Sequence, residues 1–160
     1  MIARLRPWPT MATLLLAACA SAPPDEQRAA LAADATDTPA LAELPTHQLA
    51  RGQCALVLWS RNSTPVRFLV TLDQPAVANV MVQGKIVELA RVQQSGRSLH
   101  GQFPEQLYRG EGISLEVSFT RSDARELAGG AVVSSAVVEY VDAAGWTSII
   151  PAAGLIACQT

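Results

Sequence analysis

Alternation of apolar and polar residues dominates the second part of the chain. ISLEVSFT, over residues 113–120, places Ile, Leu, Val and Phe on one face and Ser, Glu, Ser and Thr on the other. VRFLVTL over 66–72 also alternates, and CALVLWS over 54–60 is a nearly continuous apolar run. Period-two alternation is typical of half-buried β-strands, and a short apolar run fits a strand buried on both faces. We expect strands in all three ranges.

Two longer stretches predict β-hairpins. VANVMVQGKIVELARV, residues 77–92, carries Gln-Gly at its centre between β-branched residues, and residues 129–150 have turn residues at 142–145. Pro151 interrupts the pattern before GLIACQ, which we expect to be a short closing edge strand. Residues 122–127 fit one helical turn or a loop. The pattern predicts an all-β domain, a small antiparallel sandwich or barrel of about eight strands.

The N-terminal segment has a different pattern. Arg4 and Arg6 precede a short apolar run at 11–18, and no acidic residue occurs before Asp25. This order is typical of an export signal, and the run is about half the 20 apolar residues of a membrane-spanning helix. We therefore expect residues 1–18 to be a signal peptide.

Leu16-Ala17-Ala18-Cys19 resembles the bacterial lipobox. The resemblance implies cleavage before Cys19, a diacylglycerol on its thiol, palmitate-type acyl chains on this residue, and stable anchoring to a membrane. The alternative is an ordinary signal peptide cut near Ala18 to Ala20. Ala20 after the cysteine resembles an outer-membrane address, so the expected location is the bacterial cell envelope, at the outer membrane and facing the periplasm.

Composition divides the rest of the chain into a tether and a domain. Residues 19–46 are rich in Ala, Pro and Asp and contain no aromatic residue, so we expect a disordered tether after the acylated cysteine. Residues 47–160 contain nine basic and nine acidic residues and are expected to form the β-domain. With a formal charge of −2 over the whole chain, the sequence has no basic surplus of the kind that predicts nucleic-acid binding.

Cys54 and Cys158 lie near the two ends of the predicted domain. Thiols pair in an oxidising compartment, so we expect a disulfide between them rather than two buried free thiols. Such a bridge makes the first and last strands neighbours, which favours a closed or nearly closed sheet.

Few residues indicate catalysis. His47 and His100 are the only histidines, and the sequence shows no metal-ligand spacing, phosphate loop or dinucleotide fingerprint. We therefore expect no metal, no cofactor and no enzymatic activity. Trp59 and Trp146 lie within apparent strands and are expected in the core.

Residues 93–112 are polar and long for a strand connection, and long loops on β-scaffolds often carry binding residues. The alternative is a solvated loop with one or two aromatic side chains in the core. The candidate binding residues are Ser95, Gly96, Arg97, His100, Tyr108, Arg109 and Glu111.

Short motifs resemble the membrane-bound inhibitors of C-type lysozyme: GQC, the hairpin VMVQGKIVEL, QQSG, LYRGEG and the terminal ACQ. The resemblance implies a small β-barrel lipoprotein with a cysteine at each end of its domain. It also implies that Arg97 and Arg109 would approach the lysozyme cleft. The sequence departs from that pattern in lacking a second serine–glycine repeat and in having Arg where the family has Lys.

Three functions follow as hypotheses. The first is a lipid-anchored envelope protein whose β-domain binds a protein or another envelope component without catalysis. The second is an inhibitor of C-type lysozyme. The third is a small-ligand carrier or enzyme, which would require a deep apolar cavity.

Overall fold

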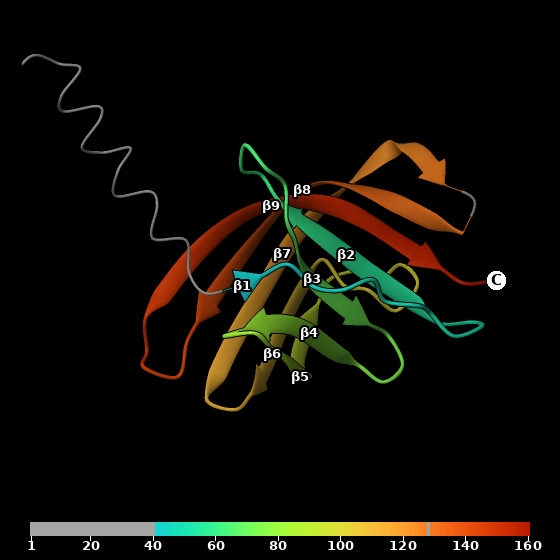
Figure 1. The fold of residues 1–160 in the computed structure, drawn as a ribbon. Coiled ribbons are helices and arrows are strands. Elements are labelled where there is room, and N and C mark those ends of the chain that lie inside the picture. Colours follow the sequence, from blue (N-terminus) through green and yellow to red (C-terminus); the bar gives the residue numbers. More distant parts are fainter. Residues whose placement is uncertain (1–40, 128) are drawn as a thin grey trace, which may run out of the picture. The chain divides into compact units, whose positions relative to one another are not determined.

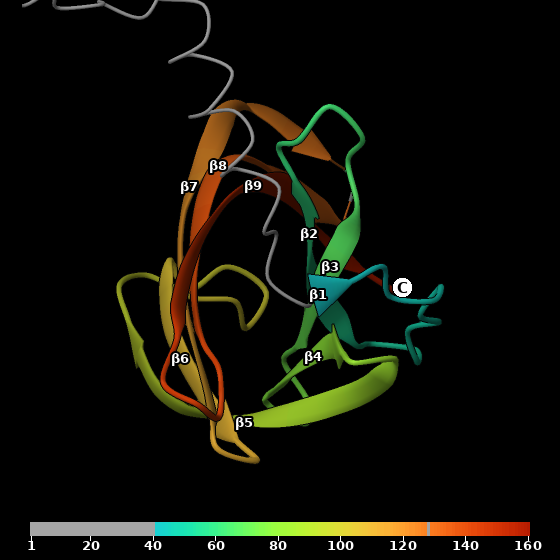
Figure 2. The same cartoon turned by 60° about the vertical axis from the view of Figure 1, so that its left-hand side comes forward.

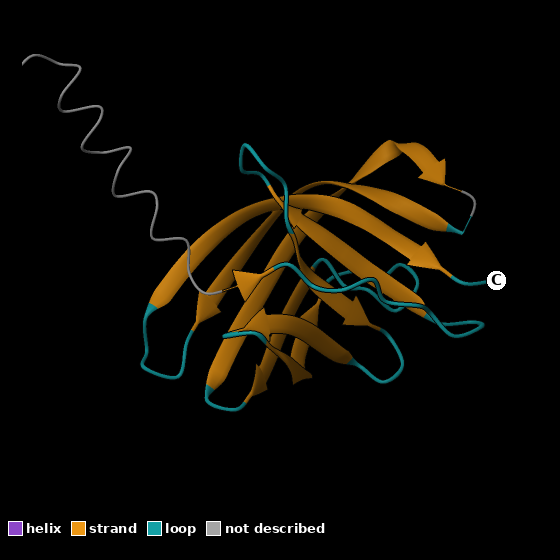
Figure 3. Cartoon of the chain, in the orientation of Figure 1, coloured by secondary structure: helices purple, strands orange, loops and turns teal. Residues whose placement is uncertain are grey.

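The computed structural model of the chain describes residues 41–127 and 129–160. Residues 1–18, Cys19 and most of the predicted tether lie outside this part. The described residues form strands joined by turns and loops (Figures 1 and 3). They contain no helix long and apolar enough to cross a membrane. The strands are β1 (Leu41–Ala42), β2 (Cys54–Ser60), β3 (Arg67–Leu72), β4 (Val77–Val82), β5 (Lys85–Ser95), β6 (Glu105–Gly110), β7 (Ile113–Leu127), β8 (Gly130–Val141) and β9 (Thr147–Cys158).

Strands β2 to β9 form a closed, up-and-down antiparallel barrel. Each of them pairs with its neighbours in sequence, and β9 returns to pair with β2 over seven residue pairs from Cys54↔Cys158 to Ser60↔Ala152. Figure 2 shows β2–β4 on one side of the ring, β6–β9 on the other, and β5 passing between them. The short strand β1 pairs antiparallel with the end of β4, at Val82 and Met81. The prediction of an all-β domain of about eight strands is confirmed, and the sheet is a barrel.

Side chains from all eight strands fill the interior. On β7, Ile113, Leu115, Val117 and Phe119 point inward and are at most 7% exposed, whereas Glu116 between them faces solvent. Full burial of a large apolar side chain stabilises a fold by roughly 1.5–3 kcal/mol. Other buried members of this cluster include Leu56, Leu58, Phe68, Leu69, Leu89, Tyr108, Val138 and Ile156.

A second apolar cluster covers the outer face of β2–β4. Leu44 is 3% exposed and lies with Ala55, Val70 and Leu72. The backbone N–H of Leu44 donates to the carbonyl of Arg67 at 2.8 Å, and the Arg67 guanidinium donates back to the Leu44 carbonyl at 2.7 Å. Residues 41–46 therefore belong to the packed module, although the sequence assigns them to the tether.

The predicted disulfide is confirmed. Cys54 and Cys158 face each other across β2 and β9 with a Cα–Cα distance of 4.0 Å, and 104 positions separate them in sequence. The bridge joins the first and last strands of the barrel, as expected.

Three local predictions are wrong. Residues 93–112 are not one long loop, because β5 continues to Ser95 and β6 occupies 105–110. Residues 122–127 are neither a helical turn nor a loop, since β7 extends through them and pairs with β8 again at Glu126 and Leu127 after a register shift. Pro151 does not precede an edge strand: it lies within β9, which pairs on both sides. Its carbonyl accepts from the N–H of Arg61, which lies just beyond the end of β2 at Ser60. The proline nitrogen faces the same side, so its missing N–H removes no hydrogen bond between β9 and β8.

Candidate functional site

The structure separates the predicted binding residues. Ser95 ends β5, and Gly96, Arg97 and His100 lie in the loop from 96 to 104 at one end of the barrel. Arg109 faces outward near the other end of β6, with Glu111 in the turn that follows. Tyr108 is 0% exposed and belongs to the interior cluster, so its side chain is unavailable to a partner.

The loop from 96 to 104 contains a tight turn with His100 and Gly101 at its centre. Leu99 and Gln102 exchange backbone hydrogen bonds of 2.9 and 3.0 Å around them. His100 has φ of 51° and Gly101 of 70°, the double positive φ of a type I′ turn. A Cβ on Gly101 would lie 2.5 Å from the Cβ of Asp73, so only glycine permits this approach to the β3–β4 connection.

A polar network fixes this loop to the barrel. The Thr71 hydroxyl on β3 donates to Gln102 Oε1 at 2.7 Å. Arg91 Nη1 on β5 donates to the Gly101 carbonyl at 3.0 Å and to Gln106 Oε1 at 2.9 Å. Gln106 Oε1 also accepts from the Tyr108 hydroxyl at 2.7 Å. Gln102 and Gln106 are 1% and 2% exposed, so these bonds satisfy amide oxygens that would otherwise be costly to bury, whereas the buried Gln102 Nε2 has no hydrogen-bond partner among the described residues.

Arg91 reaches the network because it follows Val87 and Leu89 on the inward face of β5, and a bulge comes directly after it. The pairing with β6 shifts between Arg91, which is opposite Tyr108, and Gln93, which is opposite Leu107. The guanidinium also lies 5.3 Å from the centre of the Phe103 ring. Burial raises the pKa of Tyr108 above its ordinary value, although Thr71 and the Arg91 charge act in the opposite direction.

The turn brings His100 to the disulfide. The ligand atoms of His100, Cys54 and Cys158 all lie within 4.8 Å of one another. His100 is exposed and Cys158 is half-buried. The sequence pattern does not indicate this group, because these residues are 46 and more positions apart. The available signal was the dipeptide His-Gly, since His and Gly both tolerate positive φ.

The outer face of β6–β9 is the second notable surface. Trp146 in the β8–β9 turn is 77% exposed, Ile149 is 59% and Val137 is 45%. The prediction that Trp146 lies in the core is therefore wrong, and Trp59, which was also expected there, is only half-buried. The outward residues pair across the strands in two rows, Glu105–Ser118–Val137–Pro151 and Leu107–Glu116–Glu139–Ile149.

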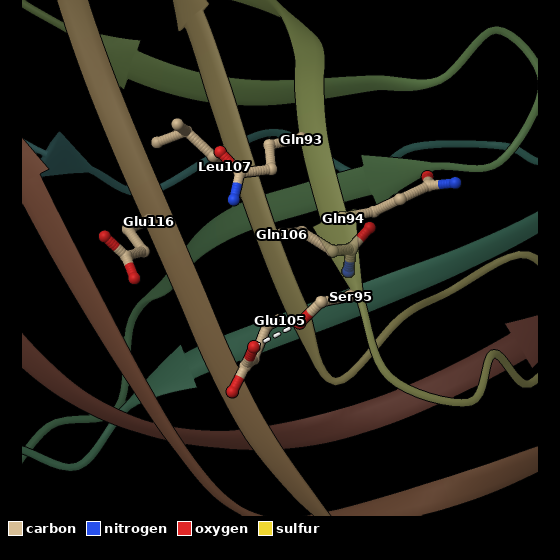
Figure 4. Close-up of a pocket in the computed structure, with 7 residues that line it drawn as sticks. All are labelled: Gln93, Gln94, Ser95, Glu105, Gln106, Leu107 and Glu116. Atoms are coloured by element: carbon tan, nitrogen blue, oxygen red, sulfur yellow. Dashed lines mark hydrogen bonds between the residues drawn. The ribbon is translucent and has the colours of Figure 1, made fainter.

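A shallow hollow of about 90 Å³ lies at the β5 side of this face (Figure 4). The Ser95 hydroxyl donates to the Glu105 carboxylate across β5 and β6, and Glu116 stands apart on β7. The hollow is open and polar. Its lining residues are Gln93, Gln94, Ser95, Glu105, Gln106, Leu107 and Glu116.

Comparison with known proteins finds no matching family model, curated protein or solved structure.

Proposed function

We propose that this chain is a lipid-anchored protein of the bacterial cell envelope whose barrel binds another protein through the outer face of β6–β9, without catalysis. The Leu-Ala-Ala-Cys motif at 16–19 supports the anchor, and the disulfide is consistent with an oxidising compartment. The filled barrel interior favours binding on the outside over carriage of a small ligand inside.

The observation that carries this proposal is the composition of the outer face. Ile149, Val137 and Pro151 face outward on β8 and β9, where an ordinary surface strand would carry polar residues, and exposed Trp146 lies in the turn between these two strands. Aromatic and aliphatic side chains surrounded by polar ones are typical of the centre of a protein–protein interface. Exposed apolar patches rimmed by polar residues are typical of interaction sites, which supports this face as the binding surface.

The carboxylates on the same face indicate the partner's charge. Glu116 and Glu139 are direct cross-strand partners, an arrangement that is destabilising for two like charges. Glu105 lies on the neighbouring row. A partner with an apolar centre and cationic side chains around it would relieve this repulsion and bury the apolar residues.

Site-specific photo-crosslinking tests the proposal. A photoreactive amino acid at Ile149 in the full chain, expressed in intact bacteria, is expected to give a discrete crosslinked protein. Ile86 is the matched control, because it is 53% exposed against 59% for Ile149 and lies on β5. Val137→Glu should abolish the crosslinked species formed at Ile149. Equal crosslinking from Ile86, or none from Ile149, would refute the proposed face.

Inhibition of C-type lysozyme is the second candidate. The closed barrel with its terminal disulfide agrees with what the sequence resemblance implies. Ser95 and Arg109 lie toward opposite ends of β6, so both would contact lysozyme only along the length of that strand. This candidate predicts lysozyme binding that Arg109→Ala and added salt both weaken. Binding unaffected by Arg109→Ala, or no binding, would remove it.

A further inference from the structure

We propose that reduction of the Cys54–Cys158 disulfide turns this end of the barrel into a three-ligand Zn²⁺ site, with His100 as the third ligand. The residues come from β2, β9 and the loop from 96 to 104, and their ligand atoms already lie within 4.8 Å of one another. Two thiolates and one imidazole are a ligand set that Zn²⁺ uses, with water in the fourth position.

The distances require only a small rearrangement. In a tetrahedral site with Zn–S bonds of about 2.3 Å, two thiolate sulfurs lie about 3.8 Å apart. Two sulfurs joined by a bond are closer than this, so they must separate after reduction. Rotation of the two cysteine side chains supplies this movement, while the imidazole has to move toward the sulfurs.

The backbone holds both cysteines without the bridge. On one side of the pair, the strands continue through six further residue pairs of β2 and β9. On the other side, the Gln159 N–H donates to the Gln53 carbonyl at 3.0 Å and the Gly52 N–H donates to the Gln159 carbonyl at 2.7 Å. The Cys54 N–H also donates to Asp73 Oδ1 at 2.9 Å. The thiols therefore remain opposite each other when the bond opens.

The third ligand is held independently of the disulfide. The turn at His100–Gly101 is fixed by the Arg91 bond to the Gly101 carbonyl and by the Thr71 bond to Gln102. The close approach of Gly101 to Asp73 sets its position against the β3–β4 connection. His100 is thus presented on a fixed turn rather than on a free loop.

The chemistry balances with a dithiol as reductant. A dithiol transfers two electrons and two protons to the S–S bond, becomes a disulfide itself, and leaves Cys54 and Cys158 as thiols. Zn²⁺ then displaces both thiol protons and accepts one lone pair from the neutral imidazole of His100. Cys158 is half-buried and His100 is exposed, so reductant and metal both have access from solvent.

Metal binding to the reduced and oxidised chain tests the proposal. The full chain with Cys19→Ala is used, because this change removes the one other thiol. After reduction by a dithiol and its removal under anaerobic conditions, Co²⁺ should give thiolate-to-metal charge-transfer absorption with one ion per chain, and Zn²⁺ should displace it. The oxidised chain should give neither signal.

Two histidine variants provide the matched comparison. His100→Ala should weaken Zn²⁺ binding by at least 10- to 100-fold, the range seen when groups supporting a metal ligand are lost. His47→Ala should leave it unchanged. Circular dichroism of the reduced chain should show the barrel intact. Unfolding on reduction, absence of a thiolate–metal signal, or equal binding by both variants would overturn the proposal.

Discussion

At the scale of single residues, Tyr108 shows how the interior uses a polar side chain. Its ring is fully buried in the barrel and its hydroxyl donates to Gln106 Oε1. The Arg91 guanidinium donates to the same oxygen, which connects the tyrosine to the loop from 96 to 104. The sequence pattern treats Tyr108 as a candidate recognition residue, because tyrosine is common in interfaces as well as in cores.

The raised pKa of Tyr108 predicts a loss of stability at alkaline pH. Burial, the largest cause, keeps the phenol neutral in the folded state above its ordinary pKa of 10.0, whereas the unfolded chain ionises it there. The contribution is fully present below pH 10 and is lost as the pH rises through the folded-state pKa, with a slope of up to about 1.4 kcal/mol per pH unit.

Urea unfolding between pH 8 and 11 measures this effect. The free energy of unfolding should fall more steeply above pH 10 for the natural chain than for Tyr108→Phe. Tyr140, whose pKa is raised by burial and by the Asp142 carboxylate, remains in both proteins and contributes equally. Identical alkaline slopes would contradict the burial of a neutral phenol in the folded barrel.

At the scale of elements, β6 explains why a loop was predicted in place of a strand. Its inward residues are Gln106 and Tyr108, whereas Leu107 points outward and is half-buried. In β6 a polar residue therefore points into the barrel and an apolar residue points outward, the reverse of the usual pattern. A prediction that places apolar residues inside does not recognise this strand. β7 was predicted correctly at 113–120, where four apolar residues face the interior. Its charged continuation to Leu127 carries no such pattern.

The position of the loop from 96 to 104 depends on Arg91 of β5, and not on Arg109 of the adjacent strand β6. Arg91 lies inward and bonds Gly101 and Gln106, whereas Arg109 lies outward and is exposed. Arg91→Ala should lower the free energy of unfolding by about 1–3 kcal/mol, because buried acceptors lose a charged donor. Amide hydrogen exchange in residues 96–104 should accelerate at the same time.

Arg109→Ala is the matched control for this change. A surface substitution of this kind is usually within about 0.5 kcal/mol of neutral, and it should leave exchange in the loop unchanged. Both measurements use denaturant unfolding and mass-detected exchange under the same conditions. Equal effects of the two substitutions would show that Arg91 does not fix the loop.

At the scale of the whole molecule, the sequence predicts the barrel better than its surfaces. Alternation at 113–120 and the turn at Gln83–Gly84 identified strands, and two cysteines near the domain ends identified how the sheet closes. The pattern of apolar and polar residues does not indicate the outer face of β6–β9 or the group around His100. Each depends on strand register or turn geometry between distant residues, which one-dimensional periodicity does not contain.

The same organisation supports the proposed role. The barrel is closed by hydrogen-bonded pairing of β2 with β9 and by the disulfide beside it, so its outer faces are held in fixed positions. The expected lipid on Cys19 would hold the barrel close to a membrane through residues 20–40. Under this account, binding on the outer face requires no opening of the barrel.

Intact-mass spectrometry of the full chain, purified from bacterial membranes without reductant, measures the lipid anchor and the disulfide in one experiment. We expect a chain that begins at Cys19, carries acyl groups on that residue, and is lighter by the two hydrogens lost in the Cys54–Cys158 bond. A chain that retains residues 1–18 and has three free thiols would contradict it.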